Sequence, residues 1–504
     1  MSFPLFESAD GLELEKEIKA IQAREAAPSV RSRWPQKMWQ MLFAFLLMGL
    51  LVLGILPLLR GPADGVGLVL LGYLLWRHGW SIWSAYRAGR FCNVVWPDVR
   101  RRADLMWQQG WRPQRLHVQI TACFEAPEIT RRAIFALVQQ IREEGIPTTV
   151  YYGTASAYDE AILTGFFEDA RADGDALDLQ LVFIRLKQSG HYITMGKVLR
   201  EIRRWGAEPD DLILFLDDDT ILGPDALRKT LPLFVLDPEL QLVGTGQEAI
   251  CFGPKWVRDW LRLRFARRHQ ELCSQSLSGR FLPLSGRLRI LRARRVLDEE
   301  FIRQQEQSLR FPKVASKHLR LSVSDSITWI HLLRSKGRMM FVPDVTVYSI
   351  SLLRQLNLLE LALHLRRWSG QTMQRAIQVL SLGPAVISGY IWWRVLDMRL
   401  AFLMTLLIPA LLLVGEGLSG GFAMTWIAVG VTARFLTGLY TLGRDISGRS
   451  LLLHGLWLTP LIHICVSLLD WGHRAAEWLQ DSDAVDSTDV KILPAQSRAR
   501  DRKD

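Results

Sequence analysis

Three consecutive carboxylates close an apolar run in the sequence ILFLDDDT, residues 213–220. Asp217, Asp218 and Asp219 would repel a diphosphate unless a cation lay between them, and Mg²⁺ or Mn²⁺ takes carboxylate and phosphate oxygens together. Such an ion also neutralises the charge that develops on a leaving nucleoside diphosphate. The run therefore indicates a divalent-metal site for a nucleotide-activated substrate or, as the alternative, a solvated acidic turn before a helix.

Two further patterns carry side chains suited to group transfer. Asp325, in LSVSDSITW, is a candidate general base that would deprotonate an acceptor hydroxyl in an inverting transfer. Its alternative is the N-cap of the helix that the following apolar run predicts. Arg367 and Trp368, in LRRWSG, offer a guanidinium for phosphate and a flat face for a sugar ring, or else an anchor at a membrane interface. A basic stretch at residues 258–268 would face anionic lipid, an anionic substrate or solvent.

The elements that must position these residues alternate between strand and helix. Apolar or alternating runs predict strands over residues 115–121, 147–152, 177–184 and 211–216. Helical patterns begin near residues 127, 158 and 195. This alternation predicts an α/β fold with a mostly parallel sheet. Ligands of such sheets bind at the carboxyl ends of the strands, where Thr121, Asp159 and the three aspartates would fall.

Long apolar runs flank this α/β region. The 504 residues are 49% hydrophobic and 22% charged and include 19 Trp, a mixture that predicts a soluble domain joined to membrane helices. The second apolar run, residues 65–86, is weakened by Arg77 and His78. For this run and the first one, residues 38–59, the alternative to two membrane spans is a buried helical hairpin. Because about 20 apolar residues cross a bilayer, spans are predicted at residues 38–59, 65–86, 401–415, 421–440 and 451–469.

The predicted spans give a domain plan. We expect a cytoplasmic N-terminal segment at 1–37, two transmembrane helices at 38–86, a cytoplasmic domain at 87–350, interface helices at 351–400, transmembrane helices at 401–470 and a polar tail at 471–504. Basic flanks place the domain in the cytoplasm by the positive-inside rule. Three spans after the domain would leave the C-terminus outside and four would leave it inside, and the basic tail favours inside.

Charge and cysteine content narrow the classes of partner. The net charge of +11 suits anionic lipid or an anionic substrate better than nucleic acid, given the apolar runs. The five cysteines show neither a CxxC pair nor zinc-type spacing, so we expect free thiols.

These motifs in this order resemble the family 2 membrane glycosyltransferases, which include the cellulose, chitin and hyaluronan synthases and the alginate polymerase. The family's DxD corresponds to Asp217–Asp219, and the final Asp of its base motif corresponds to Asp325. Its Q-x-x-R-W motif corresponds to residues 364–368, with His364 in place of Gln. Residues 262–280 and 284–293, with YDEAIL and LRRWSG, are most similar to the alginate polymerase over about residues 115–375. That enzyme's Gly-Asp-Asp-Lys reads Val-Ser-Asp-Ser here, which leaves the donor sugar open.

The resemblance implies a GT-A-type nucleotide-sugar-binding domain and a role for each matched residue. Asp325 would be the catalytic base, and Asp219 would hold Mg²⁺ or Mn²⁺. The residues expected to bind the nucleotide sugar are Thr121, Asp159 and Asp218, from their places at the strand ends, and Lys197 and Asp217, from the resemblance. The residues implied in binding the acceptor are Ser285, Gly286, Arg367 and Trp368.

The resemblance also implies a processive, inverting synthase that builds an exopolysaccharide from a GDP- or UDP-sugar and translocates it, with mannuronan (alginate) from GDP-mannuronate as the first choice. A multi-pass location in a bacterial inner membrane, a PilZ-type cyclic di-GMP receptor subunit and periplasmic export proteins would accompany this activity. The alternatives are another polysaccharide synthase of the cellulose or hyaluronan type, transfer of a single sugar to a lipid carrier, or a catalytically inactive membrane scaffold or receptor.

Overall fold

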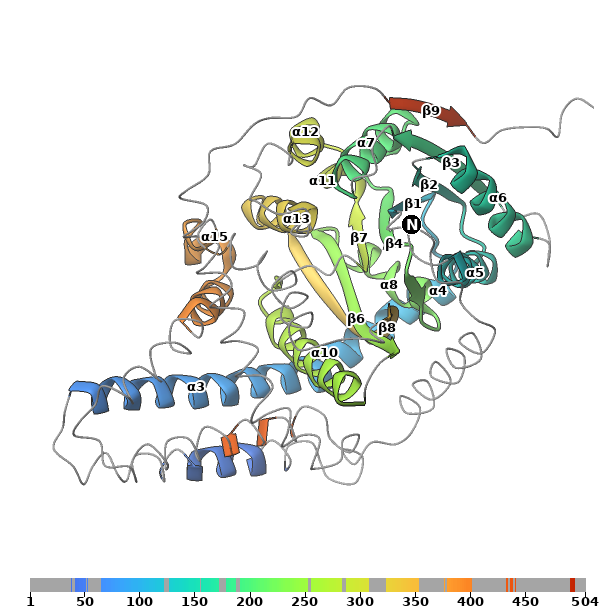
Figure 1. Cartoon of the computed structure of the whole chain (residues 1–504). Coiled ribbons are helices and arrows are strands. Elements are labelled where there is room, and N and C mark those ends of the chain that lie inside the picture. Colours follow the sequence, from blue (N-terminus) through green and yellow to red (C-terminus); the bar gives the residue numbers. More distant parts are fainter. Residues whose placement is uncertain are drawn as a thin grey trace, which may run out of the picture.

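The computed structural model describes most of the α/β domain and parts of its flanks (Figure 1). The described residues are 38, 41–50, 52, 65–121, 127–154, 156–171, 178–186, 191–252, 255–282, 287–307, 323–352, 376, 379–400, 432–433, 436–437, 440 and 490–494. The strands are β1 Leu116–Thr121, β2 Thr148–Thr154, β3 Leu179–Leu186, β4 Leu212–Asp217, β5 Thr220–Leu222, β6 Leu240–Phe252, β7 Leu288–Arg292, β8 Arg338–Leu352 and β9 Val490–Pro494. The helices are α3 Gly65–Arg90, η2 Phe91–Val95, α4 Trp96–Gln108, α5 Pro127–Glu144, α6 Ala157–Arg171, α7 His191–Arg204, α8 Ala226–Thr230, α9 Leu233–Leu236, α10 Lys255–Ser276, α11 Ala293–Val296, α12 Glu299–Gln307, α13 Val323–Arg334 and α15 Pro384–Ile387, and residues 41–50 and 389–400 are also helical.

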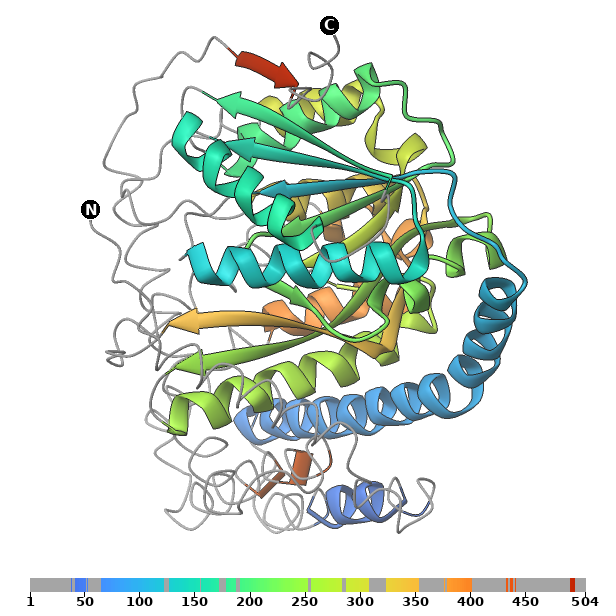
Figure 2. The ribbon, with the colours of Figure 1, turned by 90° about the vertical axis from the view of Figure 1, so that its right-hand side faces the viewer.

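Strands β1 to β4 and the helices between them form the predicted α/β unit. The four strands are parallel and lie in the order β4-β1-β2-β3. Helices α5 and α6 cover one face of the sheet, whereas α7 covers the other (Figure 2). From β1 the chain proceeds to β2 and β3 on one side, and it then returns to place β4 on the other side of β1. The boundary between β1 and β4 is therefore the topological switch point of the sheet. The predicted strands and helices of this unit are confirmed.

The hydrophobic core explains why these segments fold as they do. The residues of β4 from Leu212 to Leu216 are all buried, as expected for a central strand with both faces covered. On α5 the predicted apolar stripe faces the sheet and is buried, and it consists of Ile129, Ile134, Leu137, Val138 and Ile141.

The sheet as a whole is mixed, so the prediction of a mostly parallel sheet was wrong. Within the described residues the strand order is β5-β8-β6-β7-β4-β1-β2-β3-β9, with β7 antiparallel to both β4 and β6. The reason lies in the segment after α10. Gly279, at the amino edge of the sheet, accepts a hydrogen bond from Met339, whereas Arg287 lies at the carboxyl edge, so β7 begins at that edge and runs antiparallel to β4.

The flanking helices pack on the side of the domain formed by α10. Helix α3 lies along α10 (Figure 1), and Phe43, Leu47 and Ala85 form a small cluster with Ala433 and Tyr440. In the described part of the chain, no helix has both the length and the apolar character needed to span a bilayer. The predicted span at 65–86 falls within α3, whereas the predicted spans at 401–415, 421–440 and 451–469 lie almost wholly outside the described residues. Of the predicted interface helices at 351–400, the structure describes residues 351–352, 376 and 379–400.

Candidate active site

The three aspartates lie at the carboxyl edge of the sheet, at its switch point. Asp217 is the last residue of β4 and is paired in register with Thr121, the last residue of β1, so two of the predicted residues meet at one edge. Asp218 and Asp219 form the turn into β5, and each is only 4% exposed. Because both side chains are buried, the alternative of a solvated acidic turn is excluded. Buried carboxylates need a compensating partner such as a cation.

The turn that carries the carboxylates is held from both sides. Strand β5 pairs with β8 immediately after Asp219. Gln140 of α5 donates to the carbonyl of Gly223 (2.7 Å) and accepts from the amide of Leu227 (3.0 Å). A Cβ on Gly223 would lie 2.2 Å from the carbonyl oxygen of Thr346, so glycine is required for this approach. The carboxylates therefore sit on a rigid turn, as a preorganised site requires.

The carboxylates face two different sets of neighbours. Asp217 and Asp218 border a gap too small to hold a water molecule, between β1, β2, β4 and α5, together with Ile120, Thr130, Ala133, Ile134, Tyr152 and Leu216. Asp219 accepts a hydrogen bond from the Thr220 hydroxyl (3.2 Å) and forms an ion pair with Nη1 of Arg287. Nε of Arg287 also lies 3.9 Å from Oδ2 of Asp217.

Arg287 was not predicted as a site residue. It precedes β7, and Leu288 of that strand is paired with Leu216 of β4, which sets Arg287 level with Asp217. The sequence contains the arginine but not the antiparallel register that brings it to the carboxylates. Only the strand order could have revealed it.

The carboxylates fit a metal that shares its ligands with a substrate. In the residues that the structure describes, no three or more His, Cys, Asp or Glu side chains converge as a protein-only metal cage would require. Mg²⁺ is commonly bound by one or two carboxylates together with substrate phosphates. Asp219, fixed in the turn at the carboxyl edge of the sheet, provides such a carboxylate.

Asp159 makes the contacts of a helix cap. Its Oδ2 accepts from the Ser156 hydroxyl (2.7 Å), and the same hydroxyl accepts from the Asp159 amide (3.1 Å), at the start of α6. The next residue, Glu160, accepts from Thr154 (2.8 Å) and pairs with Arg185, at the ends of β2 and β3. Glu160 and Arg185 were not predicted.

The Arg185 pair determines the protonation of Glu160. Burial alone would raise the pKa of this carboxyl, but the hydrogen bonds from Arg185 and Thr154 and the charge of Arg185 outweigh burial and lower the pKa below its ordinary value. The two residues therefore stay ionised and tie the first turn of α6 to β3.

Lys197 lies on α7, a helix that packs closely against α12. A Cβ on Gly196 would come within 2.6 Å of the Glu306 side chain, and Arg200 pairs with Glu306 (2.8 Å) and Glu299 (3.0 Å). Lys197 itself is half-buried, about 9 Å along the helix from the carboxyl edge where α7 begins. No contact described in the structure joins Lys197 to the three aspartates.

The backbone of Asp325 lies in the first turn of α13. This helix ends at Arg334, and β8 then begins at Arg338, which is paired with Leu240 at the amino edge. A 12-residue helix is about 18 Å long, and a strand of six residues about 20 Å. The helix is therefore long enough to span the height of the sheet, and no contact described in the structure joins its first turn to the three aspartates. Since the helix begins at Val323, Asp325 lies inside it rather than at its N-cap.

The remaining predicted residues lie outside the described part of the chain. These are the side chains of Thr121 and Asp325 and the whole of Ser285, Gly286, Arg367 and Trp368. Their assignments stay predictions. The segment with Ser285 and Gly286 begins after Leu282 and ends at Arg287, whose position is described.

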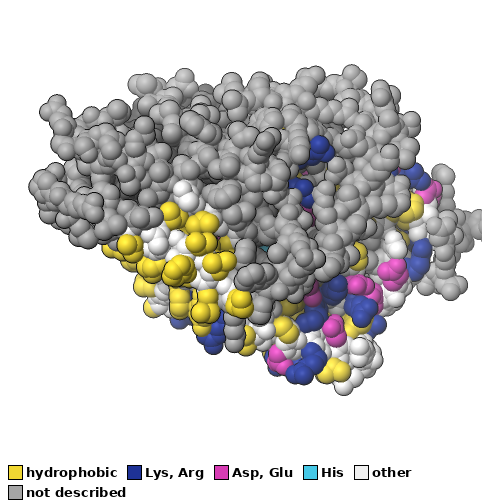
Figure 3. All heavy atoms as spheres, turned by 90° about the horizontal axis from the view of Figure 1, so that it is seen from below, with side chains coloured by type: hydrophobic (Ala, Val, Ile, Leu, Met, Phe, Trp, Pro, Cys, Tyr) yellow, Lys and Arg dark blue, Asp and Glu magenta, His cyan; other side chains and the backbone are white. Residues whose placement is uncertain are grey.

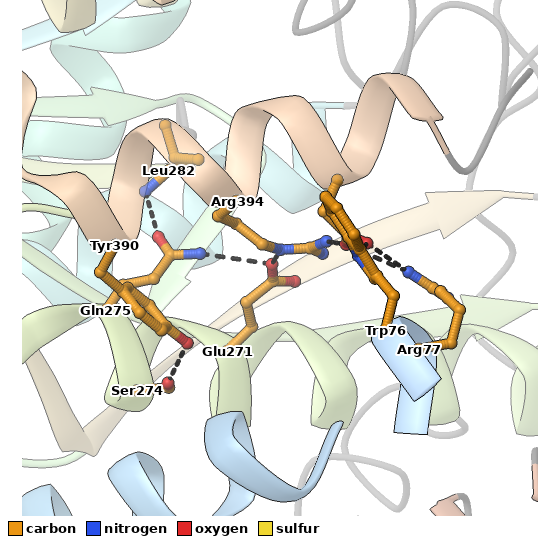
Figure 4. Close-up of polar contacts among 9 residues, drawn as sticks. Trp76, Arg77, Glu271, Ser274, Gln275, Leu282, Tyr390 and Arg394 are labelled. Atoms are coloured by element: carbon orange, nitrogen blue, oxygen red, sulfur yellow. Dashed lines mark hydrogen bonds and ion pairs between the residues drawn. The ribbon is translucent and has the colours of Figure 1, made fainter. Parts of the chain in front are cut away.

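A second polar cluster lies between helices on the side of the domain formed by α10 and joins the flanking helices to the domain (Figure 4). Asp397, which is 1% exposed, accepts from Trp76 (2.7 Å) and from Arg77 (2.9 and 3.0 Å) and pairs with Arg394. Arg394 also pairs with Glu271 of α10. The two arginines and two carboxylates compensate each other, so this cluster acts as a clamp between α3, α10 and residues 389–400.

The family comparison decides the class of this site. A sequence profile described as "Glycosyltransferase like family 2" matches residues 113–370, just over half of the chain, and covers the switch point and its carboxylates. The chain belongs to glycosyltransferase family 2. The GT-A-type fold and the prediction of a glycosyltransferase are thereby confirmed.

Two members of known name extend this assignment. The chain is 25% identical to "Glycosyltransferase alg8" of Pseudomonas syringae pv. tomato over 373 residues, which are 73% of this chain and 74% of that protein. It is 25% identical to the protein of the same name from Azotobacter vinelandii over 382 residues, 75% and 76% of the two chains. The predicted resemblance to the alginate-polymerase branch of family 2 is confirmed.

Among solved structures, the chain is similar to a mannosyltransferase from Pyrobaculum calidifontis determined with GDP-Man and Mn²⁺. The identity is 14% and the TM-score is 0.45, with 77% of this chain and 99% of that chain covered.

Proposed function

We propose that this glycosyltransferase is a processive, inverting polysaccharide synthase. Its first-choice product is mannuronan, made from GDP-mannuronate. The observation that carries the proposal is the row of three carboxylates, with Asp218 and Asp219 buried and Asp217 half-buried, at the switch point of a family 2 domain. The relation to the alg8 proteins supports the choice of polymer.

Each step of the proposed transfer has a residue in this chain. Asp217 and Asp218 orient the nucleotide sugar from the side of β1 and β2, and Asp219 holds a Mg²⁺ or Mn²⁺ ion. When bound, that ion neutralises the negative charge of the diphosphate leaving group. Asp325 accepts the proton of the acceptor hydroxyl as this oxygen bonds to the anomeric carbon, while the bond from that carbon to the diphosphate oxygen breaks on the opposite side.

We also propose that the chain is a multi-pass protein of a bacterial inner membrane, with the catalytic domain in the cytoplasm. Supporting this, exposed large apolar side chains are concentrated on the helical residues 41–50 and on α3, among them Met41, Phe45, Trp83 and Tyr86. Seen from below, hydrophobic side chains gather over one part of the surface, beside a region of mixed charge (Figure 3). A gathering of exposed apolar side chains is typical of a surface that contacts lipid or another apolar partner.

The remaining proposals concern the polymer and its regulation. Arg367 and Trp368 would form the acceptor platform, with Ser285 and Gly286 supporting the acceptor. A PilZ-type cyclic di-GMP receptor subunit and periplasmic export proteins would work with the chain.

The experiment is an assay of purified membranes with a panel of GDP- and UDP-sugars, followed by measurement of product length. A long polymer from GDP-mannuronate is expected. A long polymer from another donor would retain the synthase and change the sugar. Addition of one sugar to a lipid would support single transfer. The absence of activity with every donor in the panel would support an inactive scaffold.

A further inference from the structure

Arg287 is a cation that the fold itself places on the carboxylates. Its Nη1 pairs with Oδ1 of Asp219, the oxygen that also accepts from Thr220, and its Nε lies 3.9 Å from Asp217. The register of β7 on β4 fixes the backbone of Arg287 at this level. The guanidinium thus lies where the proposed metal and diphosphate would meet.

Exposure shows which member of the pair has room to move. The Arg287 side chain is 25% exposed, whereas that of Asp219 is 5% exposed. Asp219 is also fixed by the turn into β5 and by the contacts of Gly223 and Gln140 behind it. Arg287 is therefore the more accessible member of the pair, and Asp219 is the fixed one.

A divalent ion and the guanidinium compete for Asp219. Both are positive and both need the same carboxylate, so binding of the ion alone must overcome the resident arginine. A diphosphate changes this balance because a guanidinium binds phosphate oxygens in a two-pronged geometry.

We propose that Arg287 is a donor-binding residue that exchanges partners. It pairs with Asp219 when the site is empty, and with the diphosphate of the nucleotide sugar when Asp219 holds a divalent ion. The inference rests on the proposed function. It predicts that metal and donor bind cooperatively, since Arg287 opposes the ion alone and favours the ion together with the diphosphate.

The test uses the full chain in detergent, as wild type, Arg287→Gln and Arg287→Lys. Mn²⁺ binding without nucleotide is measured by electron paramagnetic resonance, and binding of GDP and UDP at saturating Mn²⁺ by calorimetry. Arg287→Gln should bind Mn²⁺ alone at least about 5-fold more tightly and the tighter-binding diphosphate at least about 5-fold more weakly, the low end of typical coupling between sites. Arg287→Lys keeps the charge and should lie between the two.

Arg203→Gln is the matched control. It removes one guanidinium that pairs with Glu299 (2.7 Å) at the far end of α7, with the same change in net charge. Neither affinity should change.

Opposite shifts of the two affinities support the exchange, and a structural role cannot produce them. If Arg287→Gln weakens Mn²⁺ and the diphosphate together, or changes neither, the exchange is overturned while the proposed function stands. If Arg287→Gln does not fold, an Arg287→Lys protein with wild-type affinity for both ligands would overturn it. A wild-type chain that binds neither Mn²⁺ nor either diphosphate would contradict the proposed function as well.

Discussion

At the scale of single residues, Asp325 carries the proton transfer of the proposed mechanism. Asp325→Asn keeps the size of the side chain and removes the proton acceptor. Donor binding should persist because Asp217 and Asp219 are unchanged, while the rate of sugar transfer should fall by about 10²-fold or more. Nucleotide binding and transfer rate, measured on the same preparation, separate the two effects. Transfer at the wild-type rate would place the base elsewhere.

Glu160 gives a prediction that depends on pH. Its pKa is lowered in the folded chain, so the Arg185 pair contributes stability above the ordinary pKa of 4.5 and loses it as pH falls through the lowered value. Glu160→Gln should lower the free energy of unfolding by about 1–2 kcal/mol at pH 7, and this difference should shrink below about pH 4.5. Thermal unfolding at pH 7 and at acid pH measures it.

The control for this prediction is Glu143→Gln on α5. Glu143 also accepts one side-chain hydrogen bond, from Gln139 (2.8 Å), but in an exposed pair. Its substitution should change stability little at either pH. A Glu160→Gln protein as stable as wild type at pH 7 would show that the Arg185 pair contributes nothing.

At the scale of elements, the turn between β4 and β5 depends on the absence of a side chain at Gly223. Gly223→Ala would place a Cβ 2.2 Å from the carbonyl oxygen of Thr346 and should destabilise the fold by about 1–3 kcal/mol. Gly165→Ala on α6 is the control, since nothing lies within 4 Å of its Cβ, and it should be neutral or stabilising. Denaturant titration compares them, and equal stability of the two variants would refute the close approach.

The elements also show what the sequence could and could not predict. Strands β1 to β4 were predictable because their buried runs and intervening helical stripes are local signals. The direction of β7 was not, because it depends on Gly279 and Arg287 lying at opposite edges of the sheet, which no local pattern encodes. Arg287 was missed for that reason. Asp159 was predicted as a ligand from its position after β2, where its contacts are those of a helix cap.

At the scale of the whole molecule, strand β9 bears on the side of the C-terminus. Residues 490–494 pair antiparallel with β3, the outer strand of the α/β unit. A segment hydrogen-bonded to the catalytic domain must lie on the same side of any membrane as that domain. The sequence left this question open between three and four later spans, and the pairing favours an even number of crossings after the domain.

This pairing predicts the result of a reporter fusion. Green fluorescent protein fused to the C-terminus should be fluorescent in cells, and alkaline phosphatase fused at the same position should be inactive. The reason is that strand β9 ties the C-terminal segment to the catalytic domain, which we propose to be cytoplasmic. A fusion after residue 64, between the first two predicted spans, is the control and should give the reverse. Active phosphatase at the C-terminus would contradict both the pairing and the proposed topology.

The most direct test of the account is sugar transfer by the wild-type chain and by Asp219→Asn, in membranes supplied with the nucleotide sugar that the donor panel identifies. Asp219 is the buried carboxylate on the rigid turn, and its Asn variant keeps shape while removing the charge that would hold the divalent ion. We expect the wild type to make polymer, EDTA to stop synthesis until Mn²⁺ or Mg²⁺ is restored, and Asp219→Asn to make none under any condition. Undiminished synthesis by Asp219→Asn, or by the wild type in EDTA, would contradict metal-dependent transfer at these carboxylates.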